Sequence, residues 1–311
     1  MPRIKAHIAV VIASLIASSS FAAMTNPALN SLENTIANGQ NASVITAPVV
    51  NDSQFKYHKL AKQLGISYQD LTSIIGDSQQ KIATMSAAPA TTLGAPSGFG
   101  ASAGQVYIGV GGISSRPNNA SSSDGVIATG IGFGNADKYL GVELNASITA
   151  LSKNKNARFG DDGLVGLKLH RNLPWQTGIA IGTNRVAAWG DTSYNERSYY
   201  ASVSKIFDLH PYSSNKLPLT LTLGAGNGIF RNISDQNNNK ETVSPFGAIS
   251  LDINSQLGFV FDYTADLSSI GISTVPIKSW PVTLTVAAFD LGQKSVDRFT
   301  VVAALSYSYK F

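Results

Sequence analysis

The chain has 311 residues, of which 43% are hydrophobic and only 14% are charged, and it contains no cysteine. This composition excludes a disordered chain, which needs low hydrophobicity, and a coiled coil, which needs many Glu and Lys residues. It also excludes disulfides, thiolate metal sites and cysteine nucleophiles, and a formal net charge of +4 gives no indication of a nucleic-acid partner.

Residues 1–22 have the pattern of a secretory signal peptide. Arg3 and Lys5 precede an apolar run over residues 8–17, and the small residues Ser20 and Ala22 follow it. The run is too short for a transmembrane helix, which needs about 20 apolar residues. We therefore expect export from the cytoplasm, the alternative being a buried N-terminal helix. Loss of Arg3 and Lys5 with the signal peptide would lower the net charge from +4 to +2.

Residues 23–104 are expected to precede the main fold as a leader, a short helical hairpin and a linker. The leader, 23–52, is rich in Asn, Ala and Ser, and apolar spacing within 53–85 predicts two short helices that pack on each other, on the main fold or in its mouth. The run from Leu60 to Ser67 resembles the helix-turn-helix of bacterial DNA-binding proteins, but an exported chain with little net charge argues against nucleic acid. Residues 86–104, rich in Ala, Pro, Gly and Ser, predict a linker.

From residue 105 onward, apolar and small polar residues alternate with period two, which is typical of strands that have two different faces. In one such stretch Leu257, Phe259, Phe261 and Tyr263 alternate with Gly, Val, Asp and Thr. Twelve strands are predicted, near 105–114, 125–134, 139–151, 163–173, 177–187, 198–207, 218–229, 244–253, 257–265, 269–277, 281–290 and 299–311.

The connections between these strands alternate between long and short. Residues 115–124, 152–162 and 230–243 are long and polar, whereas the connections at 135–138 and 174–176 are short. Short turns at one end and long loops at the other are typical of transmembrane β-barrels. Trp175 and Trp280 occur in short turns on the same predicted end, as expected for an aromatic girdle at a membrane interface.

The side chains on the two faces of the strands indicate whether each face meets water or lipid. One face is apolar, and the other carries mostly Gly, Ser, Thr and Ala, with too little charge for a surface exposed to water. The apolar face then meets lipid, and closure of the sheet satisfies the backbone. We predict an all-β fold over residues 105–311, a transmembrane antiparallel up-and-down β-barrel of about 12 strands preceded by a short N-terminal helical segment, with 10 or 14 strands left open.

The last strand carries the most specific pattern: Leu305, Tyr307, Tyr309 and the terminal Phe311 share one face. This resembles the C-terminal signature of bacterial outer-membrane β-barrel proteins, in particular porin-like ones. The resemblance implies a bacterial outer-membrane location, with residues 23–104 in the periplasm and outer-membrane lipid around the barrel. It also implies that periplasmic chaperones and the barrel-assembly machinery are partners, with Tyr307, Tyr309 and Phe311 as the assembly signal.

The predicted lumen holds few charged or titratable side chains. By strand register these are Glu143, Lys168, His170, Asp252 and Asp262. They either brace the wall as ion pairs or line a water path, and both alternatives stay open.

No enzymatic activity, cofactor or metal site is predicted. An outer-membrane phospholipase would need Ser and His on the lipid side, but His170 faces the lumen by register, and no metal-ligand spacing or nucleotide motif occurs. We therefore expect a narrow porin-like channel for small solutes, open or plugged by residues 53–85. The alternative is a non-transporting surface or structural protein that binds a partner through its long loops.

Overall fold

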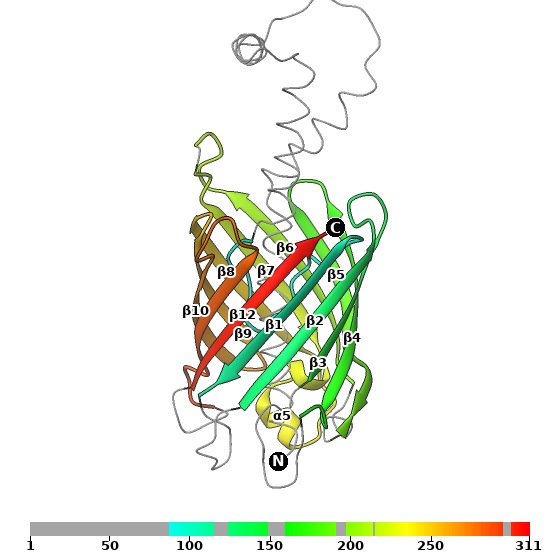
Figure 1. The fold of residues 1–311 in the computed structure, drawn as a ribbon. Helices are drawn as coiled ribbons and strands as arrows, with labels where there is room; N and C mark the ends of the chain where they lie inside the picture. The colour runs from blue at the N-terminus through cyan, green and yellow to red at the C-terminus, as the bar shows by residue number, and fades with distance from the viewer. Residues whose placement is uncertain (1–86, 115–123, 149–158, 191–196, 214, 295–299) are drawn as a thin grey trace, which may run out of the picture.

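The computed structural model describes residues 87–114, 124–148, 159–190, 197–213, 215–294 and 300–311. Twelve antiparallel strands form one closed barrel, in which each strand pairs with its neighbours in sequence and β1 pairs with β12 (Figure 1). The strands are β1 (Gln105–Ile113), β2 (Asp124–Gly134), β3 (Gly141–Ile148), β4 (Gly163–Leu173), β5 (Thr177–Trp189), β6 (Tyr199–Asp208), β7 (Pro218–Gly226), β8 (Ser244–Asn254), β9 (Leu257–Thr264), β10 (Leu267–Thr274), β11 (Val282–Phe289) and β12 (Thr300–Lys310).

The predicted number of strands and the all-β class are confirmed. One local difference is at the end of β7. The sequence predicts a strand up to residue 229, whereas β7 ends at Gly226 and the chain turns into a short 3-10 helix, η2 (Gly228–Phe230). Gly228 has φ +61°, a left-handed conformation that glycine adopts without a Cβ penalty, so the strand can break there. Within the described ranges, no helix combines the length and apolar character needed to cross a membrane.

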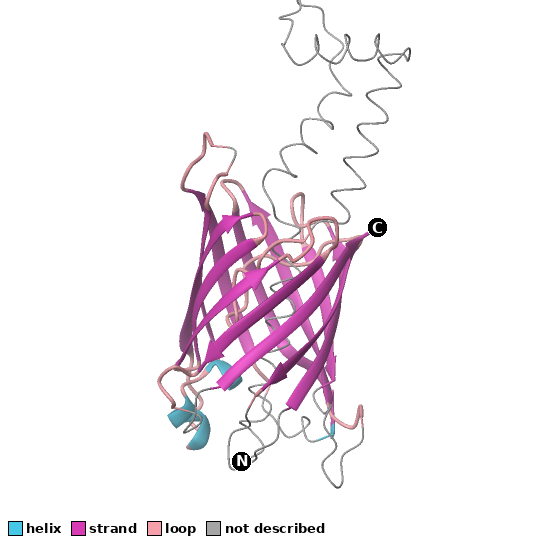
Figure 2. Cartoon of the chain, turned by 60° about the vertical axis from the view of Figure 1, so that its left-hand side comes forward, coloured by secondary structure: helices cyan, strands magenta, loops and turns pink. Residues whose placement is uncertain are grey.

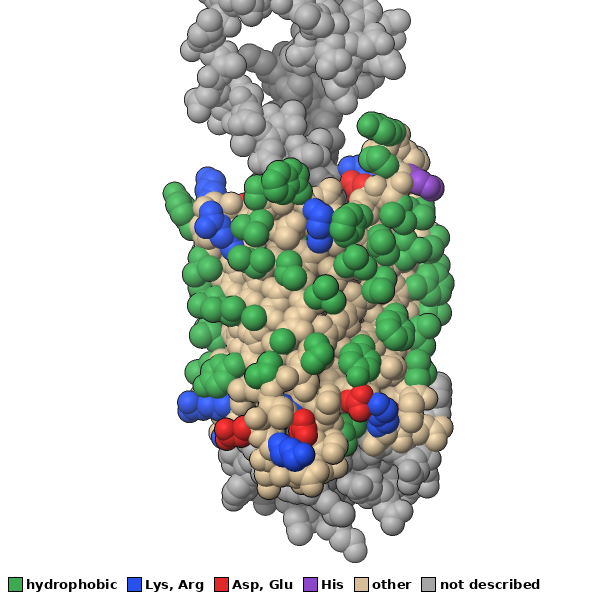
Figure 3. Space-filling view, turned by 180° about the vertical axis from the view of Figure 1, so that it is seen from behind, with side chains coloured by type: hydrophobic (Ala, Val, Ile, Leu, Met, Phe, Trp, Pro, Cys, Tyr) green, Lys and Arg blue, Asp and Glu red, His purple; other side chains and the backbone are tan. Residues whose placement is uncertain are grey.

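The two faces of the sheet differ as the alternation predicts. In β9 the exposed positions are occupied by Phe259, Phe261 and Tyr263, whereas Val260 and Asp262 between them are buried. Hydrophobic side chains cover the wall between the two ends, and charged side chains gather toward the ends (Figure 3). The inward-facing positions of the other strands are mostly Gly, Ala, Ser and Thr, so the barrel has an apolar outside and a largely small, polar inside.

The pairing of β12 with β1 closes the barrel from Gln105↔Lys310 to Ile113↔Val302. The backbone N–H of Phe311 donates to the carbonyl of Gly104 at 2.7 Å, which extends this pairing by one step. Tyr307, Tyr309 and Phe311 are all exposed on the outer face. Closure satisfies the backbone groups that open sheet edges would leave unpaired.

The barrel has two different ends, named here by their content. The terminal end holds the start of β1, the finish of β12 and the connections 135–140, 174–176, 209–217, 255–256 and 275–281. The loop end holds the longest described connection, 227–243, which contains η2 and the short helix α5 (Ile233–Asn237) (Figure 1). Two connections break the expected pattern. The β6–β7 connection, 209–217, is long although it lies at the terminal end, and β9 and β10 are joined at the loop end by only Ala265 and Asp266.

Candidate functional site in the barrel lumen

Residues 88–101, called here the lumenal segment, lie inside the barrel. Every residue of this segment is buried, and its hydrogen bonds reach inward-facing side chains on opposite sides of the wall, from Ser273 on β10 to Ser204 on β6. In Figure 2, irregular chain lies in the interior of the barrel near the terminal end. The composition predicts a linker outside the barrel, but the structure shows a segment that fills the lumen. The predicted hairpin plug, 53–85, lies outside the described residues.

The first limb of the segment runs from the terminal end toward the middle of the lumen. The hydroxyl of Thr283, at the start of β11, donates to the carbonyl of Ala88 at 3.1 Å. The amide of Ala90 then donates to the Ser273 hydroxyl at 2.7 Å. Wall hydroxyl groups therefore satisfy backbone groups that would otherwise be buried without partners.

Asp262 on β9 holds the turn of the segment. Its Oδ2 atom accepts hydrogen bonds from three consecutive backbone amides, those of Leu93, Gly94 and Ala95, at 3.0, 3.0 and 2.9 Å. The hydroxyl of Thr264 donates to its Oδ1 atom at 2.8 Å. A charged acceptor makes each of these bonds stronger than a neutral one would, so Asp262 is the main attachment point at the turn.

The second limb returns toward the terminal end along β6, β5, β4 and β3. The amide of Gly98 donates to the Ser204 hydroxyl at 2.8 Å. A Cβ atom added to Gly98 would lie 2.3 Å from the carbonyl oxygen of Gly178 on β5. Only a glycine allows so close an approach of segment and wall.

Glu143 on β3 and Lys168 on β4 lie directly opposite each other in the strand register. Lys168 Nζ is 3.9 Å from Glu143 Oε2, and both residues are buried. Glu143 also accepts hydrogen bonds from the Tyr107 hydroxyl at 2.7 Å and from the amide of Ala101 at 3.2 Å. Lys168 donates to the carbonyl of Phe99 at 3.0 Å. This pair therefore braces the wall and also binds the backbone of the lumenal segment.

His170 lies two residues beyond Lys168 on the same inward face. Its Nε2 atom is 2.9 Å from the carbonyl oxygen of Ala101. Gly100 packs so closely on the imidazole that a Cβ atom there would lie 2.2 Å from its Cδ2 atom. The segment thus covers His170, which does not reach the lipid face.

Asp252 on β8 has different surroundings. It lies opposite Gly258 on β9 in the register, and a Cβ atom added to that glycine would approach both the Asp252 Oδ1 atom and the Pro89 ring. The Oδ1 atom is buried and has no hydrogen-bond partner among the described residues. Asp252 therefore lies near the segment at Pro89, and its Oδ1 atom makes no hydrogen bond to the segment.

Apolar side chains complete the filling of the lumen. Leu93 and Phe99 of the segment belong to a buried cluster that includes wall residues of both sides. Near the loop end, Phe230 of η2 packs on Tyr200 and Phe246, with ring centroids 5.6 and 5.2 Å apart. Ala95 of the segment belongs to the same cluster as Phe230. The segment and η2 thus pack side chains into the lumen from its two ends.

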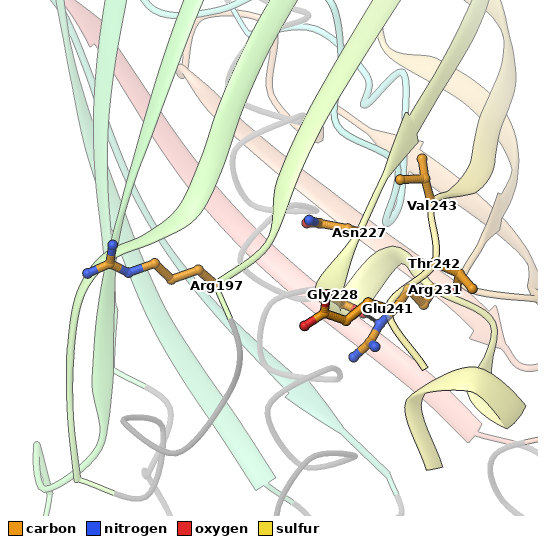
Figure 4. A pocket seen from close by; sticks show the side chains of 7 residues that line it. All are labelled: Arg197, Asn227, Gly228, Arg231, Glu241, Thr242 and Val243. Atoms are coloured by element: carbon orange, nitrogen blue, oxygen red, sulfur yellow. Dashed lines mark hydrogen bonds between the residues drawn. The ribbon is translucent and has the colours of Figure 1, made fainter. Parts of the chain in front are cut away.

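A cavity of about 390 Å³ opens at the loop end (Figure 4). Arg197 lies on one side of it, and Arg231 and Glu241 lie on the other. Arg231 is buried and donates through Nε to the carbonyl of Gly228 at 3.0 Å and through Nη1 to the carbonyl of Lys240. Its guanidinium therefore shapes the loop that carries η2. The complete lining is Arg197, Asn227, Gly228, Arg231, Glu241, Thr242 and Val243.

An exposed ion pair fixes the short turn between β9 and β10. Lys294 Nζ lies 2.7 Å from Asp266 Oδ1, and this hydrogen bond lowers the pKa of the Asp266 carboxyl from its usual range. The Tyr263 hydroxyl donates to the same carboxylate at 2.8 Å. No group of three or more metal-ligating side chains occurs in the part of the chain that the structure describes.

The structure thus places four of the five predicted lumen residues, Glu143, Lys168, His170 and Asp262, in hydrogen bonds with one segment. Sequence reasoning did not identify Tyr107, Ser204, Ser273 and Thr283, which complete the attachment. Their positions in the period-two pattern of their strands do place them on the inward face. The nearest sequence signal for the segment itself is its lack of any charged residue between 88 and 101, which suits a narrow enclosed path.

No family model matches the sequence, and no curated protein matches it. Solved structures similar to this chain include an outer membrane channel from Pseudomonas putida F1, with 10% identity, a TM-score of 0.39, and coverage of 67% of this chain and 96% of that one. The NanC porin has 10% identity, a TM-score of 0.37 and coverage of 66% and 99%. The Salmonella typhi outer membrane phospholipase has 11% identity, a TM-score of 0.37 and coverage of 66% and 90%. Similarity at this level carries no argument about function, which therefore rests on the geometry of the barrel.

Proposed function

We propose that the protein is an integral β-barrel of the bacterial outer membrane. The apolar outer wall supports this, because a barrel in water would expose charged residues there. Ile181 and Ile270 are 58% and 50% exposed in the middle of their strands. Trp175 and Trp280 project from turns at the terminal end, at 85% and 57% exposure, as interfacial residues do. Closure of the sheet leaves no open strand edge, as a spanning β-structure requires.

We further propose that the barrel is a channel for small solutes that its own lumenal segment closes. The single observation that carries this proposal is that residues 88–101 lie in the lumen, surrounded by a largely polar wall. Barrels of about eight strands are filled by the side chains of the wall, whereas twelve strands enclose more space. Here a separate piece of chain fills that space, held mainly by hydrogen bonds to hydroxyl and carboxylate groups. Water can replace such bonds when the segment leaves, so the vacated wall would be wetted.

A non-transporting surface protein is the second candidate. The observation that favours it is the aromatic cluster of Phe230, Tyr200 and Phe246, which packs inside the barrel near the loop end. In that case the filled lumen would be a permanent core. The extended connections at the loop end would then carry the function by binding a partner.

Conductance in planar lipid bilayers separates the two candidates. The comparison uses the full chain, a variant lacking residues 88–101, the same deletion combined with Phe230→Ala, and a control lacking residues 30–43, an equal number from the leader. For a gated channel we expect little steady current through the full chain and the control, and a stable current after deletion of the segment. Heat-modifiable migration confirms that each barrel has folded. Folded deletion variants without current would overturn the channel and favour the surface protein.

We also propose that the protein is not an enzyme. The supporting observation is the position of His170, which is buried in the lumen against Ala101 and Gly100. An enzyme that cleaves lipids needs its catalytic His where the acyl chain can reach it. A test for phospholipase activity on the full chain, with His170→Ala as the comparison, should give no activity in either protein.

A further inference from the structure

The described lumen wall has an excess of acidic groups on one side. Glu143 is paired with Lys168 across neighbouring strands, so these two charges compensate each other. Among the described residues, no basic side chain lies within ion-pairing distance of Asp252 or Asp262, which stand on the adjacent strands β8 and β9. The wall formed by β8 and β9 therefore holds two acidic side chains without a described basic partner, whereas Glu143 and Lys168 on β3 and β4 form an acid–base pair.

The backbone donors that now bind the Asp262 carboxylate show what kind of ligand fits there. Three N–H groups, from Leu93, Gly94 and Ala95, converge on one carboxylate oxygen. A primary ammonium group also presents three N–H donors from a single atom, and it adds a full positive charge. The turn of the lumenal segment thus provides neutral donors at a position where an organic ammonium ion would provide charged ones.

Asp252 extends the acidic wall toward the terminal end. Gly258, its partner in the register, precedes Asp262 by four residues on β9, which corresponds to about 13 Å along the strand. The buried Oδ1 atom of Asp252 has no hydrogen-bond partner among the described residues, although the segment passes beside it at Pro89. A buried carboxylate oxygen without a donor is costly, and a passing cation would satisfy it.

We propose that the lumen, once the segment has left, selects cations, with Asp262 binding the ammonium group of a small organic cation and Asp252 forming a second station on the same path. This inference rests on the proposed channel function. Since Glu143 and Lys168 compensate each other, the two aspartates set the sign of the selectivity in the part of the lumen that the lumenal segment vacates. The lumenal segment then closes the channel by occupying the same carboxylate that the solute would use.

The test measures the reversal potential in a KCl gradient for the variant lacking residues 88–101. We expect K⁺ to be more permeable than Cl⁻, and this preference to fall strongly with Asp262→Asn and less with Asp252→Asn. Asp137→Asn removes the same charge from an exposed turn at the terminal end and should leave the preference unchanged. A stable current without cation preference, or a preference unaffected by Asp262→Asn, would overturn the inference while the channel itself stands.

Ligand binding gives a second measurement that does not need conduction. Calorimetric titration of the detergent-solubilised deletion variant with n-butylammonium should show binding that Asp262→Asn abolishes. Tetramethylammonium has the same charge but no N–H donors, so it should bind more weakly. If the folded barrel carries no current yet binds n-butylammonium through Asp262, the channel fails and the cation site stands. Equal titration curves for the two ions would reject the site. So would equal n-butylammonium curves for the deletion variant with Asp262 and for the same variant carrying Asp262→Asn. If the deletion prevents folding, a Gly–Ser sequence of equal length in place of residues 88–101 serves in both experiments.

Discussion

At the residue scale, the strongest constraint in the lumen is the charge pair of Glu143 and Lys168. Each partner is buried and compensated twice, by the other charge and by hydrogen bonds to the lumenal segment. Tyr107 adds a third donor to Glu143 from a strand on the far side of β2. Loss of one charge leaves the other desolvated, and the cost of an uncompensated buried charge is larger than the value of the pair itself.

Lys168→Met should lower the free energy of unfolding, measured in urea, by about 3 kcal/mol. This is near the lower end of the cost of breaking a buried ion pair, because Tyr107 and Ala101 still donate hydrogen bonds to Glu143. Adding Glu143→Gln should recover part of this loss. Lys216→Met breaks an exposed pair with Asp208, separated by 3.6 Å, and should cost less than about 1 kcal/mol. If the effects of the two lumen substitutions simply add, the pair is not coupled and this account of the cluster is wrong.

At the element scale, β12 decides whether the sheet becomes a barrel. It pairs with β1 from Val302 to Lys310 and with β11 from Thr300 to Tyr307. Its outer face carries Leu305, Tyr307 and Tyr309, and its inner face carries small residues such as Ser306 and Ser308. The strand therefore presents large side chains to lipid and small side chains to the lumen. Phe311 adds the last backbone hydrogen bond of the β1–β12 pairing.

Replacing Tyr309 with Asp should reduce the fraction of protein that inserts into the membrane, measured as heat-modifiable migration. Tyr309 pairs with Val106 near the terminal end, where a lipid-facing charge costs only about 0–1 kcal/mol. The expected loss therefore comes mainly from poorer recognition by the assembly machinery. Tyr309→Phe keeps the aromatic ring and should insert normally, and deletion of Phe311 should behave like Tyr309→Asp. Normal insertion of both damaged variants would contradict the assembly role.

At the scale of the whole molecule, the barrel is asymmetric from end to end. The terminal end carries most of the short turns and the two most exposed Trp residues, Trp175 and Trp280, and the lumenal segment enters and leaves there. The loop end carries the connection 227–243, with η2 folded inward and α5 outside the strands. In outer-membrane barrels the long loops face the exterior, so we expect the segment to be accessible from the periplasm.

Cysteines placed in this Cys-free chain test that orientation. Asn238→Cys, at the exposed end of α5, should react on intact cells with a reagent that does not cross the membrane. Asn135→Cys, in an exposed turn of the terminal end, should react only after the cells are opened. Labelling of Asn135→Cys alone on intact cells would reverse the orientation, and equal labelling of both would reject a spanning barrel.

The sequence by itself determined the barrel, its lipid face and the inward position of Glu143, Lys168 and Asp262, because alternation with period two assigns each side chain to a face. It could not determine register, since alternation is unchanged when one strand slides by two residues past the next. That Glu143 and Lys168 lie directly opposite each other is therefore known only from the structure.

The position of residues 88–101 was decided only by the tertiary structure. These residues have no periodicity, and their partners, Ser273, Asp262 and Ser204, follow them by more than one hundred residues. No single contact specifies the path. Small residues allow the segment to enter a narrow lumen, and its backbone groups find donors and acceptors only after closure has brought opposite walls together. The composition that predicts a flexible linker in open solvent is therefore also the one that fills an enclosed polar space.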